Sequence, residues 1–139
     1  MPSIRGSLNH YQPLIDVSIG QGVSSTDRES YRALIDTGAT RTCISRQIVE
    51  RHDLEFRTKV LVQGADSMPA RRPAYAFSLG LYCQTADRLG DTSTLYVLPH
   101  ELVAPAFLER AGFDVLIGMD FLSTGKLIID RHDFSFEFS

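Results

Sequence analysis

The feature that most constrains the fold of this chain is a series of short apolar runs. Apolar and polar residues alternate over 14–19 and again over 134–138, where every second residue is Phe. Successive side chains of a strand point to opposite faces, so this period of two is typical of half-buried strands. Further strands are expected at 31–35, 60–63, 75–81, 94–98, 115–117 and 127–129. The pattern predicts an all-β fold.

Few segments favour helix. Ser45 is a suitable N-cap for a helix that runs to about His52, because its hydroxyl can accept from a free N–H of the first turn. A short helical turn is expected through Phe121. A further helix is expected over 101–110, although Pro105 would interrupt it. One or two short helices should therefore accompany the strands.

Length and charge limit the possible functions. The chain has 139 residues, 43% of them hydrophobic and 22% charged, with a formal net charge of -3. This is the size of one soluble domain, expected to span 1–139. The acidic balance disfavours nucleic acid as a partner. The sequence shows no membrane-spanning segment and no targeting signal, so the cytoplasm is the default location.

No cofactor or metal is expected. Cys43 and Cys83 form no Cys-x-x-Cys motif, and the four histidines have no metal-ligand spacing. The cysteines are expected to be buried free thiols. Gly20-Gln21-Gly22 lacks the third glycine of a dinucleotide-binding loop.

Two motifs point to chemistry. Residues 34–40 read Leu-Ile-Asp-Thr-Gly-Ala-Thr, an apolar strand that delivers the Asp36 carboxylate into a tight turn. Residues 114–122 read Asp-Val-Leu-Ile-Gly-Met-Asp-Phe-Leu, in which Leu116 and Ile117 precede Gly118. A strand that ends at Asp and Gly needs no catalytic explanation when it occurs alone. The two motifs together, in this order and about eighty residues apart, are far more specific.

The pair of motifs resembles the active-site loop and the later Leu-Ile-Gly motif of retropepsin-like aspartic proteases. Length and the prolines Pro69 and Pro73 resemble the single-domain, homodimeric, bacterial or cellular members. The resemblance covers about 14–138 and implies a closed β barrel, the acid protease fold. It implies an aspartic endopeptidase that needs no cofactor and whose substrate is a polypeptide.

The resemblance assigns roles to the residues of the first motif. Asp36 would be the catalytic residue, Thr37 would hydrogen-bond across a dimer axis, and Gly38 would let the substrate backbone approach. This route needs two carboxylates that share one proton. The chain has one Asp-Thr-Gly, because Asp91-Thr92 is followed by Ser93. A homodimer is therefore implied, with one Asp36 from each subunit.

The fourth residue of the loop bears on the pH of activity. Ala39 matches the retroviral form of the motif, whereas the pepsin-like form has Ser there. A Ser hydroxyl can donate a hydrogen bond to a carboxylate and lower the pKa of the pair. Ala39 therefore predicts a pH optimum nearer mild acidity than strong acid.

A segment between the motifs is expected to form the substrate flap. The hairpin formed by the strands at 60–63 and 75–81 lies where retropepsins carry this element, and its tip is expected at Gly64, Ala65, Asp66 and Ser67. Retroviral flaps are richer in glycine. Retroviral enzymes also pair an acid after the loop with an Arg after the later glycine, where this chain has Thr40, Arg41 and Met119.

Three functions remain open at this stage. The first is the endopeptidase. The second is a dimeric module with the same fold that binds peptides without cleaving them. The third is a subunit that dimerises only after processing or partner binding. The terminal Phe134, Phe136 and Phe138 fit either a core or an intersubunit sheet, since retropepsin termini form such a sheet.

Overall fold

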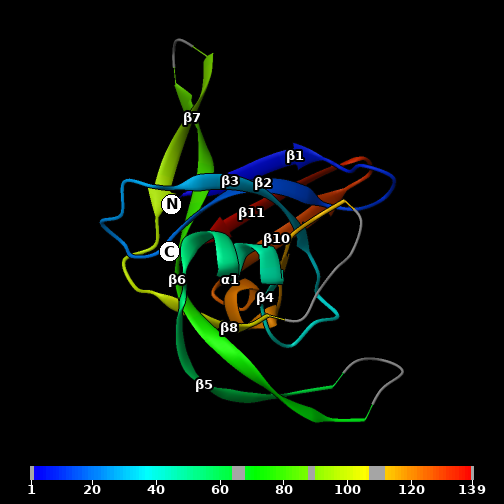
Figure 1. Ribbon diagram of the computed structural model, residues 1–139. Coiled ribbons are helices and arrows are strands. Elements are labelled where there is room, and N and C mark those ends of the chain that lie inside the picture. Colours follow the sequence, from blue (N-terminus) through cyan, green and yellow to red (C-terminus); the bar gives the residue numbers. More distant parts are fainter. Residues whose placement is uncertain (1, 64–67, 88–89, 107–111, 139) are drawn as a thin grey trace.

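The computed structural model describes residues 2–63, 68–87, 90–106 and 112–138. These residues form a β structure with two short helices (Figure 1). Strands and helices follow the order β1 (Ser3–Ser7), β2 (Leu14–Gly20), β3 (Glu29–Ile35), β4 (Cys43–Ile44), α1 (Arg46–His52), β5 (Glu55–Val62), β6 (Ala70–Asp87), β7 (Gly90–Val97), β8 (Leu102–Pro105), β9 (Val115–Ile117), α2 (Met119–Leu122), β10 (Gly125–Asp130) and β11 (Asp133–Phe138). The predicted all-β fold is confirmed.

The larger sheet curls into a nearly closed barrel. Its strand order is β4-β9-β3-β2-β6-β5, with β7 and β8 also paired to β6. A bridge between Ile44 and Ala106 joins the end of β4 to the residue that follows β8. The ring β4-β9-β3-β2-β6-β8 is thereby closed by one contact. Its interior is filled by branched aliphatic side chains and by Phe77, which is fully buried.

The strand β6 is long enough to serve two hairpins. Its first part pairs with β5 from Ala70 to Ala76, and its second part pairs with β7 from Gly80 to Asp87. The two hairpins extend from the barrel in opposite directions (Figure 1). The tip expected for the flap, Gly64 to Ser67, lies outside the described residues. The hairpin that would carry it is present.

Both ends of the chain pair within the chain. The second sheet has the order β1-β11-β10. The three phenylalanines of β11 point into the core, where they are 1–3% exposed, and two of them contact Phe121 of α2 at ring-centroid distances of 5.6 and 5.7 Å. Of the two interpretations of these side chains, the structure supports the core.

One helix prediction is wrong. The residues expected to start a helix at 101–110 form β8, which pairs with β6 from Ala74 to Phe77. Pro105 has no N–H for a helix interior, and a strand edge tolerates that lack. Residues 107–110 lie outside the described part. The helix after Ser45 is present as α1, although the Ser45 hydroxyl makes no cap hydrogen bond.

A partly buried arginine joins β2 to β6. Arg28 donates from Nε to the Ser18 hydroxyl at 2.8 Å and from Nη1 to the Ser78 hydroxyl at 2.9 Å. Its Nη2 donates to the carbonyls of the same two serines. Gly20 and Gly80 make the room, because a Cβ on either would lie within 3.3 Å of the guanidinium. The small residues of these strands thus form a slot for one large side chain.

No helix in the described part is both long enough and apolar enough to span a bilayer.

Candidate active site

The Asp36 carboxylate stands at the end of a barrel strand. The strand β3 pairs in parallel with β9, with Ala33 opposite Val115 and Ile35 opposite Ile117. The Asp36 N–H donates to the Ile117 carbonyl at 2.9 Å, which extends this pairing by one bond. The two sequence motifs, about eighty residues apart, therefore meet in one piece of sheet.

The loop after Asp36 is a tight turn held by its own backbone. The Gly38 N–H donates to Asp36 Oδ1 at 2.9 Å, and the Ala39 N–H donates to the Asp36 carbonyl at 3.2 Å. Asp36 is half-buried, whereas Thr37 and Gly38 are exposed. One carboxylate oxygen is thus fixed by a backbone donor. The loop presents the carboxylate and the Gly38 backbone toward the outside of the barrel end.

The first residues of α2 hold the Asp36 loop through two backbone hydrogen bonds. The Met119 N–H donates to the Ala39 carbonyl at 2.8 Å, and the Asp120 N–H donates to the Thr40 carbonyl at 3.1 Å. Gly118 is required by space. A Cβ there would lie 2.6 Å from the Arg41 carbonyl carbon and 2.9 Å from the Ala39 oxygen. The glycine of the Leu-Ile-Gly motif therefore lets α2 approach the backbone of the loop.

Asp120 is a site residue that the sequence reasoning missed. Its carboxylate accepts from the Thr42 N–H at 2.9 Å and from the Thr42 hydroxyl at 2.7 Å, and the same hydroxyl accepts from the Gly118 N–H at 3.2 Å. Thr42 is 2% exposed. Asp120 thus joins the far end of the active-site loop to the start of α2. The acid in the second motif was the available signal, because an acid at a helix start often accepts backbone N–H bonds.

This arrangement replaces the brace expected for retroviral enzymes. Those enzymes pair an acid after the loop with an Arg after the later glycine, and this chain has Arg41 and Met119 instead. Here the acid lies on the α2 side, at Asp120, and the loop supplies the donor, Thr42. The direction of the contact is reversed, but the same two segments are held together.

Leu116 and Ile117 are buried on opposite faces of β9. Ile117 belongs to the main core, whereas Leu116 lies in a smaller cluster with Leu34, Cys43 and Phe113. Burial raises the pKa of the Cys43 thiol to about 12, and nearby Asp120 adds to this shift. Cys43 therefore stays a thiol at neutral pH and is not a candidate nucleophile.

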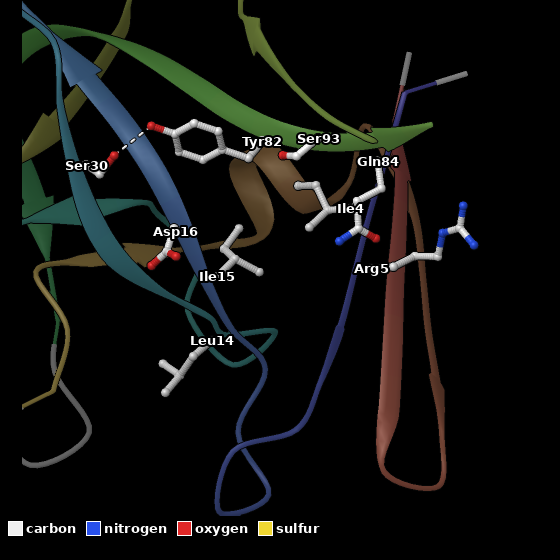
Figure 2. A pocket seen from close by; sticks show the side chains of 9 residues that line it. All are labelled: Ile4, Arg5, Leu14, Ile15, Asp16, Ser30, Tyr82, Gln84 and Ser93. Atoms are coloured by element: carbon white, nitrogen blue, oxygen red, sulfur yellow. Dashed lines mark hydrogen bonds between the residues drawn. The ribbon is translucent and has the colours of Figure 1, made fainter. Parts of the chain in front are cut away.

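The structure has a cavity of about 580 Å³ elsewhere, lined by residues of β1 and of the barrel strands β2, β3, β6 and β7. Figure 2 shows its lining side chains, among which the hydroxyls of Ser30 and Tyr82 are hydrogen-bonded at 2.6 Å. None of the residues of the Asp36 loop or of the Leu-Ile-Gly motif lines this cavity. The candidate active site is the loop and not this pocket. Within the described residues, no group of three or more His, Cys, Asp or Glu side chains is arranged to hold a metal ion.

A nearly closed β barrel in which two distant strands converge on an Asp-Thr-Gly turn is the architecture of aspartic proteases. The sequence profile described as aspartyl protease matches residues 15–121, and the chain belongs to this family. A crystal structure of a retropepsin-like aspartic protease from Rickettsia conorii matches with a TM-score of 0.54 and 14% identity, over 98% of this chain and 90% of that chain. The fold is therefore retropepsin-like. A search of curated proteins found no significant match.

Proposed function

We propose that the protein is an aspartic endopeptidase that acts as a homodimer. The observation that carries this proposal is the Asp36 carboxylate, held half-exposed at a barrel end by the Gly38 N–H in the only Asp-Thr-Gly of the chain. A rigid carboxylate at an open site is what general acid–base catalysis needs. One chain supplies one such group, so the complete site requires a second copy.

Two Asp36 carboxylates that face each other would share one proton, since like charges about 3 Å apart cannot both ionise. The ionised carboxylate takes a proton from water, and the water oxygen adds to the peptide carbonyl carbon. The protonated carboxyl group transfers its proton to the carbonyl oxygen, which becomes a hydroxyl of the tetrahedral intermediate. The carboxyl group that took the proton from water then gives it to the amide nitrogen while the other carboxylate takes a proton from a hydroxyl of the intermediate, so the C–N bond breaks and a carboxylic acid and an amine are released.

The remaining loop residues would position these groups. Thr37 is exposed beside Asp36, where it can reach the same loop of a second copy. Gly38 has no side chain, and a Cβ there would lie 3.2 Å from Asp36 Oδ1. An extended polypeptide is the expected substrate, because its backbone can pair with the β5–β6 hairpin as an added strand. Gly64 to Ser67 remain the proposed flap tip.

The test compares wild type with Asp36→Asn on a diverse peptide mixture between about pH 4 and 7, with new termini identified by mass spectrometry. The carboxamide keeps the size of Asp36 but cannot act as a base, so cleavage should fall at least about 100-fold. Asp53→Asn is the matched control. Asp53 is exposed and left-handed, with φ of 48°, a conformation that Asn also adopts. It should cleave like wild type.

Equal cleavage by wild type and Asp36→Asn would refute the catalytic role of Asp36. No cleavage by a wild-type sample shown to be dimeric would refute the endopeptidase and favour the peptide-binding module.

A further inference from the structure

The two arms of the β5–β6 hairpin carry an excess of positive charge. Over 55–62 and 70–76 they contain four cations and one acid. These residues are Arg57, Lys59, Arg71, Arg72 and Glu55. The whole chain, by contrast, has a formal net charge of -3. Positive charge is therefore concentrated on the hairpin that the substrate is expected to contact.

One of these four cations has acidic partners in the described part of the chain. Arg57 Nε lies 3.5 Å from a carboxylate oxygen of Glu55, and its Nη2 lies 2.9 Å from a carboxylate oxygen of Glu101. The other three cations are exposed, and none of them forms a salt bridge with a described residue. Their charge is therefore open to an external partner.

The strand register separates the three open cations onto two faces of the hairpin. Leu61 lies opposite Arg71, and Lys59 lies opposite Pro73. Residues directly opposite each other share a face, and so do residues two positions apart, so these four side chains lie on one face. Lys59 and Arg71 are diagonal neighbours there, about 7–8 Å apart at the backbone and within reach of long side chains. Arg72, the next residue of β6, points to the other face.

The face with Lys59 and Arg71 continues the inner face of the barrel. Farther along β6, Tyr75 packs against the main core and Phe77 is fully buried in it. Every second side chain of a strand points the same way, so Arg71 lies on the same side of β6 as these two residues. A polypeptide between the hairpin and the barrel end that carries Asp36 would meet this face.

Two cations on one face favour an acidic ligand. Like charges held close together repel, and a carboxylate placed between them relieves the repulsion and adds two attractions. Leu61 is 61% exposed on the same face and offers an apolar contact beside the charges. An extended peptide presents every second side chain to such a face. The face therefore suits an extended acidic peptide better than a neutral or basic one.

We propose that Lys59 and Arg71 make the β5–β6 hairpin selective for polypeptide segments with acidic side chains. The inference rests on the proposed function, because it names the substrate class of the same site. An Asp or Glu carboxylate of the substrate accepts hydrogen bonds from the Arg71 guanidinium and the Lys59 ammonium group. Both cations lie on the hairpin arms and not on the Asp36 loop, so they select the substrate and take no part in breaking the peptide bond.

The first test measures peptide binding to Asp36→Asn, which should leave the probe uncleaved. The probe is a fluorescein-labelled peptide of alternating Thr and Glu residues, whose acids share one face when the peptide is extended. The comparison is the same peptide with Gln in place of Glu. Fluorescence anisotropy should show the acidic peptide bound at least about fivefold more tightly, the effect of one good exposed charge pair. A rise in NaCl from about 0.05 to about 0.5 M should remove most of this preference, because salt screens exposed charges.

The second test uses two neighbouring arginines as a matched pair. Arg71→Gln and Arg72→Gln, each made in the Asp36→Asn background, remove the same charge from adjacent residues that point to opposite faces. Arg71→Gln should weaken binding of the acidic peptide about fivefold, and so should Lys59→Gln, while binding of the Gln peptide stays unchanged. Arg72→Gln should change binding of the acidic peptide by less than about twofold. Circular dichroism establishes that each variant is folded.

The outcomes separate this inference from the proposed activity. Equal binding of the two peptides, binding of neither, or an equal loss in Arg71→Gln and Arg72→Gln would overturn the acidic selectivity and leave the endopeptidase open. Tighter binding of an oligothymidylate with the same charge as the acidic peptide would assign the cations to nucleic acid and also overturn the inference. Selective binding that depends on Arg71 and not on Arg72, with a wild type that cleaves no peptide, would support the selectivity and overturn the peptidase.

Discussion

Removal of the Asp120 carboxylate should destabilise the fold and the active-site loop together. In Asp120→Ala the Thr42 N–H and the Thr42 hydroxyl lose their acceptor. Thr42 is only 2% exposed, so both donors are left buried without a partner. A buried donor left without a partner costs about 1–3 kcal/mol. Asp120 itself is exposed, so water can enter part of the space that its side chain leaves. The lower end of this energy range therefore applies to each of the two donors. The expected loss is about 2 kcal/mol of unfolding free energy, or roughly 6–10 °C in Tm for a chain of this length.

The assay is chemical denaturation with wild type and Asp16→Ala in parallel. Asp16 forms an exposed pair with Arg32 at 3.5 Å, and such pairs contribute about 0–1 kcal/mol. A second comparison uses Thr42→Ser, which keeps the hydroxyl, against Thr42→Val, which removes it. Valine should destabilise the protein more than serine does. The reasoning fails if Asp120→Ala stays within about 0.5 kcal/mol of wild type, or if serine and valine at position 42 are equally destabilising.

Four further changes have defined outcomes. Gly118→Ala pushes a methyl group into the backbone of the active-site loop, so stability should fall by about 1–3 kcal/mol and peptide cleavage should fall by more than the loss of folded protein explains; an unchanged Tm would contradict the steric argument. Ala39→Ser adds a donor beside the carboxylates, and the acid limb of the pH–rate profile should move to lower pH, whereas an unmoved limb would show that the new hydroxyl does not reach them. Burial, followed by the hydrogen bond to Glu29, raises the pKa of Tyr31 to about 12; its neutral form is therefore favoured in the folded state, and stability should decline as pH rises from about 10 to 12. Tyr31→Phe should reduce that decline, and a variant with the wild-type slope would exclude Tyr31 as its source. Cys43 and Cys83 should react with a thiol reagent slowly in the native protein and fast in denaturant, and fast native labelling would show that burial does not protect them.

Most of the strands and the two motifs themselves could be predicted because they depend on local patterns. Alternation of apolar and polar residues is preserved wherever one face is buried, as it is in β11, where the three phenylalanines enter the core. The Asp-Thr-Gly turn and the end of the Leu-Ile-Gly strand can also be recognised locally, because each is an apolar run that stops at or near a glycine. The boundaries were harder to predict. The strand β6 runs from Ala70 to Asp87, beyond its apolar centre, and its first residues, 70–72, are exposed in the hairpin with β5.

The failures involve contacts between distant residues. Residues 102–105 have no strong strand pattern, and their extended form is fixed by pairing with β6. The Arg28 slot requires Ser18 and Ser78 to be brought together, 60 positions apart in sequence. Asp120 acts through Thr42, which lies 78 positions away. Such partners are chosen by the tertiary fold, and a local pattern in one sequence does not reveal them.

The pairing of β3 with β9 also bears on when the Asp36 turn becomes ordered during synthesis. Ala33 pairs with Val115, so the intervening chain must be closed into a loop before the Asp36 turn acquires its support. Contacts of such long sequence separation form slowly, after the local hairpins. A ribosome that has not yet released residues 115–122 therefore holds a chain with its aspartate but without the backbone that positions it. The Asp36 turn thus acquires its support only after residues 115–122 have left the ribosome, and a chain that lacks them holds the aspartate in an unsupported turn.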